Sequence, residues 1–279
     1  MRQVLSRCGW LIFVLFAVAC AHTPAKKAIS TDPEVLTYDA ELVEQRLDGA
    51  KLSFPYEIKN PALQPVTLTS LRHKLVIDDE LEVTGQAAPA LAVAAQASIN
   101  DKLTVEATLP ATEEALNKRE GKTNLRYHLY ATFVITGPTG AEEYEAEWHG
   151  DLYPPQRPVL LVEPHAARYG SSAAKVELSF NLVINNPNPF PIPTEGLSYV
   201  LEVADLKLFE GLVAAGEKLV AGADREFELS KTIGDGMDDP NLAAAIKGRP
   251  SIPYRFEGTL TAGAFSMHKI IEGSIAFSK

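Results

Sequence analysis

Residues 185–196 read NNPNPFPIPTEG and place four prolines within seven positions, from Pro187 to Pro193. The preceding residues 176–184, VELSFNLVI, alternate apolar and polar side chains as a strand does. Proline has no backbone N–H, and it keeps the residue before it out of the helical region. We therefore expect a strand that ends at Asn186 and a stiff crossover at an exposed sheet end, with the amides of Asn186 and Asn188 bonded to nearby backbone. A ligand-binding role for this segment is the alternative.

The same pattern occurs a second time, 126 positions earlier. LSFPYEIKNP (residues 52–61) aligns with LSFNLVINNP (residues 178–187), and eleven of 34 positions are identical at this single offset. The repeat predicts two copies of one domain, residues 35–155 and 156–279, joined near residues 154–158. The matched motif residues are Asn60 with Asn186, Pro61 with Pro187, Pro65 with Pro191, and Gly85 with Gly211.

Each copy is mostly β by periodicity. Alternating apolar residues predict six or seven short strands per copy, and a parity change after Val203 suggests a β-bulge at Ala204 and Asp205. One short helix is expected in each copy, at residues 111–121 with Thr112 as N-cap and at residues 238–248 with Asp238 or Asp239 as N-cap and Gly248 as C-cap. The fold class is therefore all-β with one short helix per domain, in two tandem sandwiches of antiparallel sheets.

The chain resembles the late embryogenesis abundant type 2 family, whose module is also called the water stress and hypersensitive response (WHy) domain. The resemblance rests on a strand ending in Asn-Pro-Asn, a proline-broken crossover, a Gly-Leu-x-Tyr start of the next strand, and a glycine that ends it. The residues that carry it are Asn186, Pro187, Asn188, Pro189, Pro191, Gly196 and Gly211, with Asn60, Pro61 and Pro65 in the first copy. The first copy has Ala62 and Ser70 where the second has Asn188 and Gly196. The resemblance implies an immunoglobulin-like or fibronectin-like sandwich, a role in desiccation tolerance, no cofactor and no catalytic residues.

The N-terminus reads as a secretory signal. Residues 1–19 combine Arg2 and Arg7 with an apolar core and a small-residue end, and Cys20 follows directly. This resembles a bacterial lipoprotein box, so we expect a lipid on Cys20, a tether over residues 20–34, and a place at the outer membrane facing the periplasm. The alternative is an ordinary signal with Cys20 as a bystander. Cys8 would be removed, and no internal disulfide could form.

Composition excludes some classes of protein. A formal charge of −10 argues against a nucleic-acid partner. We find no nucleophile elbow, phosphate loop or metal-spaced histidines and cysteines, and we expect no enzyme activity, no cofactor, no metal and a monomer. His73 and His128 lie in strand patterns, and we expect each to be a satisfied or exposed strand residue rather than a ligand. The acidic run 235–239 fits a helix start better than a calcium site.

Three functions stay open. The first is lipid-anchored protection of envelope proteins or lipids during water loss. The second is a scaffold for a protein partner. The third is carriage of an apolar ligand between helix and sheet, where residues 91–95 and 242–246 could line a groove.

Overall fold

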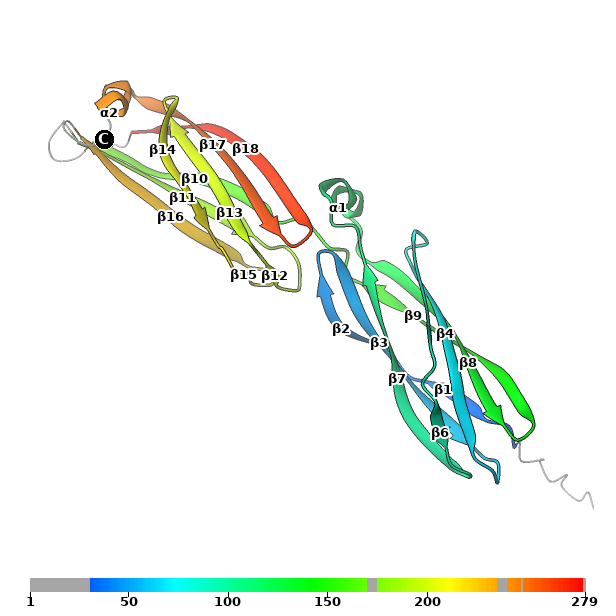
Figure 1. Cartoon of the computed structure of the whole chain (residues 1–279). Coiled ribbons are helices and arrows are strands. Elements are labelled where there is room, and N and C mark those ends of the chain that lie inside the picture. Colours follow the sequence, from blue (N-terminus) through cyan, green and yellow to red (C-terminus); the bar gives the residue numbers. More distant parts are fainter. Residues whose placement is uncertain (1–30, 170–174, 235–239, 247, 278–279) are drawn as a thin grey trace, which may run out of the picture. The chain divides into compact units, whose positions relative to one another are not determined.

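The structure is a computed structural model, which describes residues 31–169, 175–234, 240–246 and 248–277. Residues 1–19, Cys20 and the tether up to residue 30 lie outside the described residues, as do Asp238, Asp239 and the acidic run 235–239. Strands dominate, every pairing between them in the described part is antiparallel, and two short helices interrupt them (Figure 1). The architecture is all-β and sandwich-type. None of the described helices is long and apolar enough to cross a membrane.

The N-terminal half, residues 32–155, forms two sheets around one core. Its strands are β1 (Glu34–Thr37), β2 (Glu41–Arg46), β3 (Gly49–Asn60), β4 (Val66–Ile77), β5 (Leu81–Ala87), β6 (Leu91–Val93), β7 (Ala97–Thr108), β8 (Leu125–Gly137) and β9 (Gly140–Leu152). One sheet holds β1, β2, β3 and β7, and the other holds β4, β5, β6, β8 and β9. Their inner faces share one buried cluster, which includes Phe54, Leu75 and Phe133. Burial of this apolar area is the main stabilising term.

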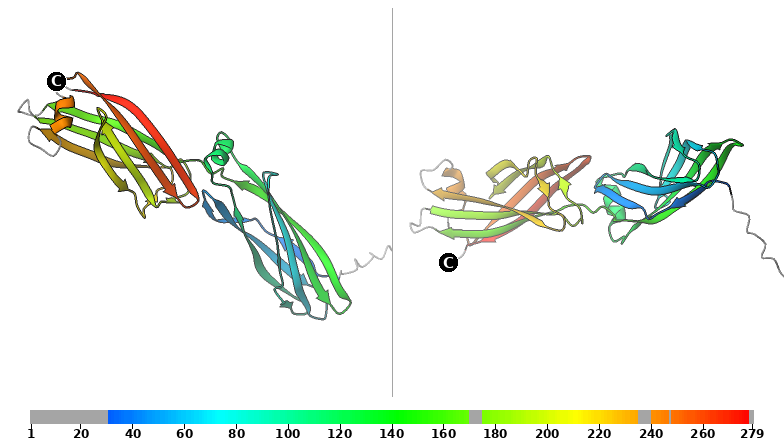
Figure 2. Two further views of the ribbon diagram at one scale, coloured as in Figure 1. Left: turned by 45° about the horizontal axis from the view of Figure 1, so that its top comes forward. Right: turned by 90° about the horizontal axis from the view of Figure 1, so that it is seen from below.

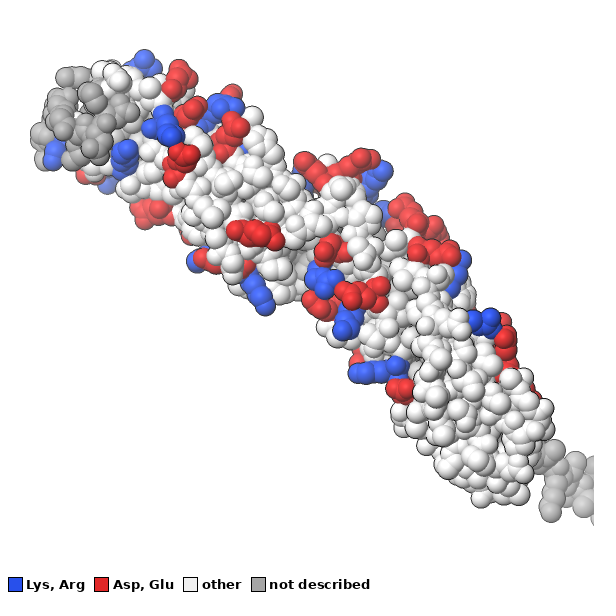
Figure 3. Space-filling view, viewed as in Figure 1, with Lys and Arg blue, Asp and Glu red and all other residues white. Residues whose placement is uncertain are grey.

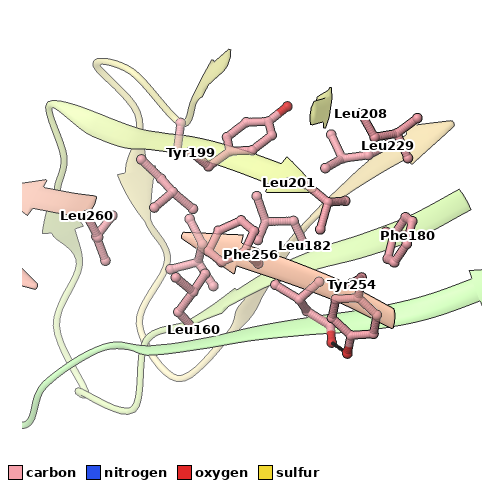
Figure 4. Close-up of a cluster of buried hydrophobic side chains, with 14 of the residues drawn as sticks. Leu160, Phe180, Leu182, Tyr199, Leu201, Leu208, Leu229, Tyr254, Phe256 and Leu260 are labelled. Atoms are coloured by element: carbon pink, nitrogen blue, oxygen red, sulfur yellow. Dashed lines mark hydrogen bonds between the residues drawn. The ribbon is translucent and has the colours of Figure 1, made fainter. Parts of the chain in front are cut away.

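The C-terminal half, residues 156–279, repeats the plan with strands β10 (Val159–Tyr169), β11 (Lys175–Asn185), β12 (Ile192–Pro193), β13 (Gly196–Val203), β14 (Leu206–Val213), β15 (Lys218–Leu219), β16 (Asp224–Gly234), β17 (Ser251–Ala262) and β18 (Phe265–Ala276). The order β10-β11-β16 makes one layer and β14-β13-β17-β18 the other, and the layers face each other in Figure 2. Figure 4 shows Phe180 and Leu182 of one sheet beside Leu201 and Phe256 of the other. This three-plus-four arrangement is that of fibronectin-like sandwiches.

The change of parity after Val203 is a turn and not a bulge. Ala204 and Asp205 both have positive φ, 51° and 64°, and they join β13 to β14 as a two-residue hairpin turn of the kind that matches strand twist. The bulge lies further on, where the register shifts opposite Leu201 and Glu202 and leaves Leu208 unpaired. The sequence expectation of a bulge at Ala204 and Asp205 was wrong because a tight hairpin produces the same change of apolar parity.

Strands are more numerous than the six or seven expected per half. The apolar alternation of β1, β2 and β10 is weak, because many of their side chains are exposed. The two-residue strands β12 and β15 pair with each other inside the crossover and the loop that faces it. Pairing therefore resumes within the proline segment before Gly196.

The helices follow their capping signals where these are described. In α1 (Glu113–Arg119), the Thr112 hydroxyl accepts a hydrogen bond from the Ala115 N–H at 3.2 Å, as expected of an N-cap. Helix α2 (Pro240–Ile246) buries Leu242 and Ile246, and Gly248 follows it with φ +71°. Its predicted N-caps, Asp238 and Asp239, lie outside the described residues.

Candidate functional site

Asn60 and Asn186 make the same hydrogen bonds in the two halves. The Asn186 Nδ2 group donates to the carbonyls of Phe190, Leu219 and Val220 at 2.9, 3.2 and 3.2 Å. The Asn60 Nδ2 group donates to the carbonyls of Gln64, Val93 and Ala94 at 2.8, 3.3 and 3.0 Å. Every partner of Asn186 is the partner of Asn60 moved on by 126 positions.

The amide oxygen completes the pattern. Asn186 Oδ1 accepts from the N–H of Asn188 at 3.0 Å, and Asn60 Oδ1 accepts from the N–H of Ala62 at 3.1 Å. Asn186 is fully buried and Asn60 is 1% exposed, so unpaired backbone groups around them would have no water to replace these bonds. Each amide thus ties the end of one strand to its own crossover and to a loop 33 or 34 residues later.

Asn188 adds a contact that the N-terminal half lacks at Ala62. Its Nδ2 group donates to the carbonyl of Gln156 at 2.7 Å and to Asn186 Oδ1 at 3.0 Å. Its Oδ1 accepts from the Gln156 N–H at 2.7 Å. One fully buried side chain therefore holds the segment just before β10 against the crossover. This explains why the second Asn-Pro is present here.

The prolines occupy the outward positions of the crossover. Pro189, Pro191 and Pro193 are exposed, whereas Phe190, Ile192 and Thr194 between them are buried. An extended chain alternates its faces, so the prolines sit where a side chain meets solvent. The outward side of the crossover is exposed, whereas Asn186, Asn188 and Ile192 close the core on its inward side. Pro187 begins this crossover, and Pro61 and the exposed Pro65 lie in the crossover of the N-terminal half.

Gly196 and Gly211 are required by their surroundings. Gly196 has φ +130°, and a Cβ there would also lie 2.7 Å from Leu212 Cδ1. Gly211 pairs across the ladder with Tyr199, and a Cβ on it would lie 3.2 Å from the Tyr199 hydroxyl. The Tyr199 ring therefore covers the glycine, and a larger residue would displace it.

Three other aromatic residues cover a glycine in the same way, which sequence reasoning missed. The pairs, each directly opposite in the ladder, are Tyr127 with Gly150, Tyr254 with Gly273 and His73 with Gly85. A glycine inside a strand, with an aromatic residue in the neighbouring strand, is the signal that could have found them.

His73 is the position that corresponds to Tyr199, and it is poorly satisfied. Its Nδ1 is buried and has no hydrogen-bond partner among the described residues. Burial lowers the pKa of His73 below the ordinary value. The expectation of a satisfied or exposed strand residue was wrong for His73. The ring faces the core side of β4, between Leu71 and Leu75. His128 is exposed and stacks on Tyr130 and His149.

Within the described part of the chain, no three histidine, cysteine, aspartate or glutamate side chains are grouped to hold a metal. Glu142, Glu143, Glu145 and Glu147 are exposed along β9, and Arg72 pairs with Glu143 at 2.6 Å. The sequence-predicted family residues gather in the two crossovers, and nothing there resembles a nucleophile with a base.

A groove of about 610 Å³ lies between α1 and the turn that joins β4 to β5. Ile77, Leu109 and Leu125 are buried along it. The half-buried Arg119 donates to the Pro110 carbonyl at 2.8 Å, and burial lowers its pKa although it stays a cation. This groove differs from the one suggested by residues 91–95 and 242–246, because Val93, Leu242 and Ile246 are buried in the cores.

One comparison with known proteins matches part of the C-terminal half to a family. Residues 181–271 match the model of the late embryogenesis abundant protein family LEA_2. No curated protein matches the sequence. Among solved structures, a candidate late embryogenesis abundant (LEA) protein is 16% identical with a TM-score of 0.35, over 50% of this chain and 76% of its own.

Two further structures are similar to parts of the chain. A protein from Archaeoglobus fulgidus has 8% identity and a TM-score of 0.31 over 44% of this chain and 94% of its own. Red sea bream transglutaminase has 12% identity and a TM-score of 0.28; the match covers 90% of this chain, which spans only 32% of that enzyme.

Proposed function

We propose that this chain, which belongs to the late embryogenesis abundant type 2 family through residues 181–271, is a lipid-anchored protein of the bacterial envelope that protects envelope components during water loss without catalysis. The family match carries the proposal. It gives a stress-related class of protein and leaves open what is protected.

The site geometry supports a role without chemistry. The family residues Asn60, Asn186 and Asn188 spend their hydrogen-bonding groups on backbone carbonyls and N–H groups. They are therefore committed to the fold, and none is free to meet a substrate. A function that depends on the solvated surface needs no particular reacting group.

The proposed anchor rests on the sequence. Cys20 follows the small residues Val18 and Ala19 after a short apolar run, which fits lipid attachment after signal cleavage. A diacylglycerol on the thiol with a second chain on the amine would exceed the two-chain requirement for stable membrane attachment. Cys20→Ser should remove metabolic labelling with palmitate and release the protein from membrane pellets, with Cys8→Ser as the control that keeps both.

The decisive experiment for protection compares survival after drying. A deletion strain should lose viability relative to the parent, and the wild-type gene should restore it. His128→Gln and Glu145→Gln should restore it equally, because both residues are exposed and serve no shared site. Unchanged survival of the deletion strain would end the protection proposal.

The groove beside α1 favours a second candidate, an apolar-ligand carrier. Its volume lies within the range of roughly 300–1,000 Å³ that is usual for small-ligand sites, and Ile77, Leu109 and Leu125 give it an apolar floor. Dodecanoate, whose carboxylate could meet Arg119, should then raise the melting temperature, and Ala115→Trp should block the effect by filling the groove. Equal shifts for wild type and Ala115→Trp would exclude this site.

A further inference from the structure

One end of the N-terminal half has no charged loops. Its loops are residues 61–65, 87–96 and 137–140, which we call the neutral end. They lie within three stretches, residues 60–71, 83–100 and 129–141, that contain no aspartate, glutamate, lysine or arginine. In the space-filling view the tip of this half is white, while red and blue side chains are scattered over its other parts (Figure 3).

Strand pairing places these loops together. Strand β3 ends at Asn60, β4 begins at Val66 and pairs with β6, and the β8–β9 hairpin turns at Gly137 and Gly140. The Gln96 N–H donates to the Ala62 carbonyl at 3.0 Å, which joins the first two loops directly. The three loops therefore form one surface.

The exposed residues of the neutral end are mostly apolar. Leu63 is 80% exposed, more than any other large apolar side chain of the described residues. Small apolar residues surround it in the loops and are exposed as well: Pro65, Ala88, Pro89, Ala92, Ala94 and Pro138. Such a surface gains from leaving water and holds no charge that would oppose it.

The fold does not demand this neutrality. At the corresponding end of the C-terminal half, the positions of Thr69, Leu91 and Ala92 are taken by Glu195, Glu217 and Lys218. Those three charged residues lie in the crossover and the loop that correspond to the neutral end, and Asn186 forms the same hydrogen bonds there as Asn60 does in the N-terminal half. The absence of charge is thus a property of the N-terminal half alone.

The chain enters the fold at the neutral end. Strand β1 begins at Glu34, which pairs with Lys59, one residue before β3 ends. Charged residues flank this end, among them Asp32, Lys59 and Glu142, which lies two residues after Gly140. Only 11 residues separate Cys20 from Asp32, so even a fully extended chain spans at most about 40 Å. A lipid on Cys20 would keep this end near a membrane surface.

We propose that the neutral end docks on the lipid bilayer to which the chain is anchored, with Leu63 inserted among the headgroups. The inference rests on the membrane attachment proposed above. Docking of one leucine and several small residues is weak by itself, but a short tether makes it intramolecular and raises the effective concentration of membrane. The acidic remainder of the protein, which anionic lipids repel, then points away from the surface.

The test separates docking from anchoring. The full-length mature chain, with Cys20→Ser and an N-terminal histidine tag in place of the lipid, is attached to vesicles of phosphatidylethanolamine, phosphatidylglycerol and a nickel-chelating lipid. Leu63→Trp reports contact through quenching by brominated lipids. Val220→Trp, at a position that is 67% exposed in the C-terminal half, is the matched control.

Docking predicts strong quenching of the Leu63→Trp variant and little for the Val220→Trp variant. Adding Ala92→Glu to Leu63→Trp should lower the docked fraction about tenfold, because a carboxylate at the contact must lose its hydration, whereas Ala92→Gln should keep most of it. Equal quenching of the two tryptophans, with all variants showing the wild-type melting curve, would overturn the proposal and leave the neutral end to a protein partner. The result does not depend on whether Cys20 is lipidated, which palmitate labelling decides.

Discussion

At the scale of single residues, one asparagine side-chain amide forms hydrogen bonds with several buried backbone groups at once. Asn186 donates to three carbonyls and accepts from both the backbone N–H and the side-chain amide of Asn188 while it is fully buried. No other side chain of that size can donate and accept at once without a charge, apart from hydroxyls with a single donor. Asn60 and Asn186 are therefore buried polar centres at corresponding ends of the two cores.

Replacement of Asn186 tests this directly. Asn186→Ala removes the side-chain partner of the buried Phe190 and Leu219 carbonyls and of the Asn188 N–H, so the free energy of unfolding should fall by about 2–4 kcal/mol. Asn186→Asp should cost at least as much, because a carboxylate cannot donate and would be buried. Denaturant unfolding measures both. Asn185→Ala, which loses only an exposed bond to Asp224, is the control and should change little.

His73 gives a second prediction at this scale. Because burial lowers its folded pKa below the ordinary value of about 6.5, the unfolded chain binds the proton first as pH falls. Stability should therefore decrease as pH drops below about 6.5 and should stop decreasing below the folded pKa.

His73→Tyr copies Tyr199 of the C-terminal half, where a tyrosine covers Gly211. This substitution should remove the decrease in stability that His73 causes as the pH falls. Melting temperatures at neutral and mildly acidic pH, compared with the exposed control His128→Gln, measure the effect. An unchanged pH dependence in His73→Tyr would show that His73 does not carry it.

At the scale of elements, the sequence was a good guide to strands that bury one face and a poor guide to the others. Alternation located β11, β13 and β17 because their inward residues are nearly all buried apolar side chains. Strands β1, β2 and β10 were missed because exposed residues blur their period. The asparagine motif was visible in the sequence, but its long-range partners Leu219 and Val220 were not, because nothing local marks a carbonyl as an acceptor.

The hairpin turn of β13 and β14 supplies an element-scale prediction. Both Ala204 and Asp205 have positive φ, a conformation that asparagine and glycine adopt at lower cost. The double change Ala204→Asn and Asp205→Gly should stabilise the protein by about 0.5–1 kcal/mol.

Gly263 provides the opposite control. It has φ +59° in the turn between β17 and β18, with open space around it, so Gly263→Ala should destabilise by about 1 kcal/mol through backbone strain alone. Thermal melts of both variants compare the two directions. If the variant with Ala204→Asn and Asp205→Gly is less stable than the wild type, the positive φ values at this turn do not limit the stability of the protein.

At the scale of the whole molecule, the central question is whether the two halves are independent domains. Each has its own pair of sheets, but residues 32–279 also form one compact unit by backbone contacts. Independence is thus a prediction from the internal repeat, which gave a boundary at residue 156. The hydrogen bonds between Asn188 and Gln156 indicate that a fragment of the C-terminal half must include Gln156.

A fragment that starts at residue 157 removes Gln156, whose N–H and carbonyl both bond to Asn188. The buried amide would then lose two partners next to the core, at a cost of about 1–3 kcal/mol. A fragment of residues 153–279 keeps them and should unfold cooperatively with dispersed amide signals in NMR. The 157–279 fragment should unfold at lower denaturant, and Asn188→Ala should bring the longer fragment down to the same level. If both fragments are equally stable, the Gln156 contact contributes nothing measurable; if neither folds, the two halves depend on each other and the repeat describes one cooperative unit.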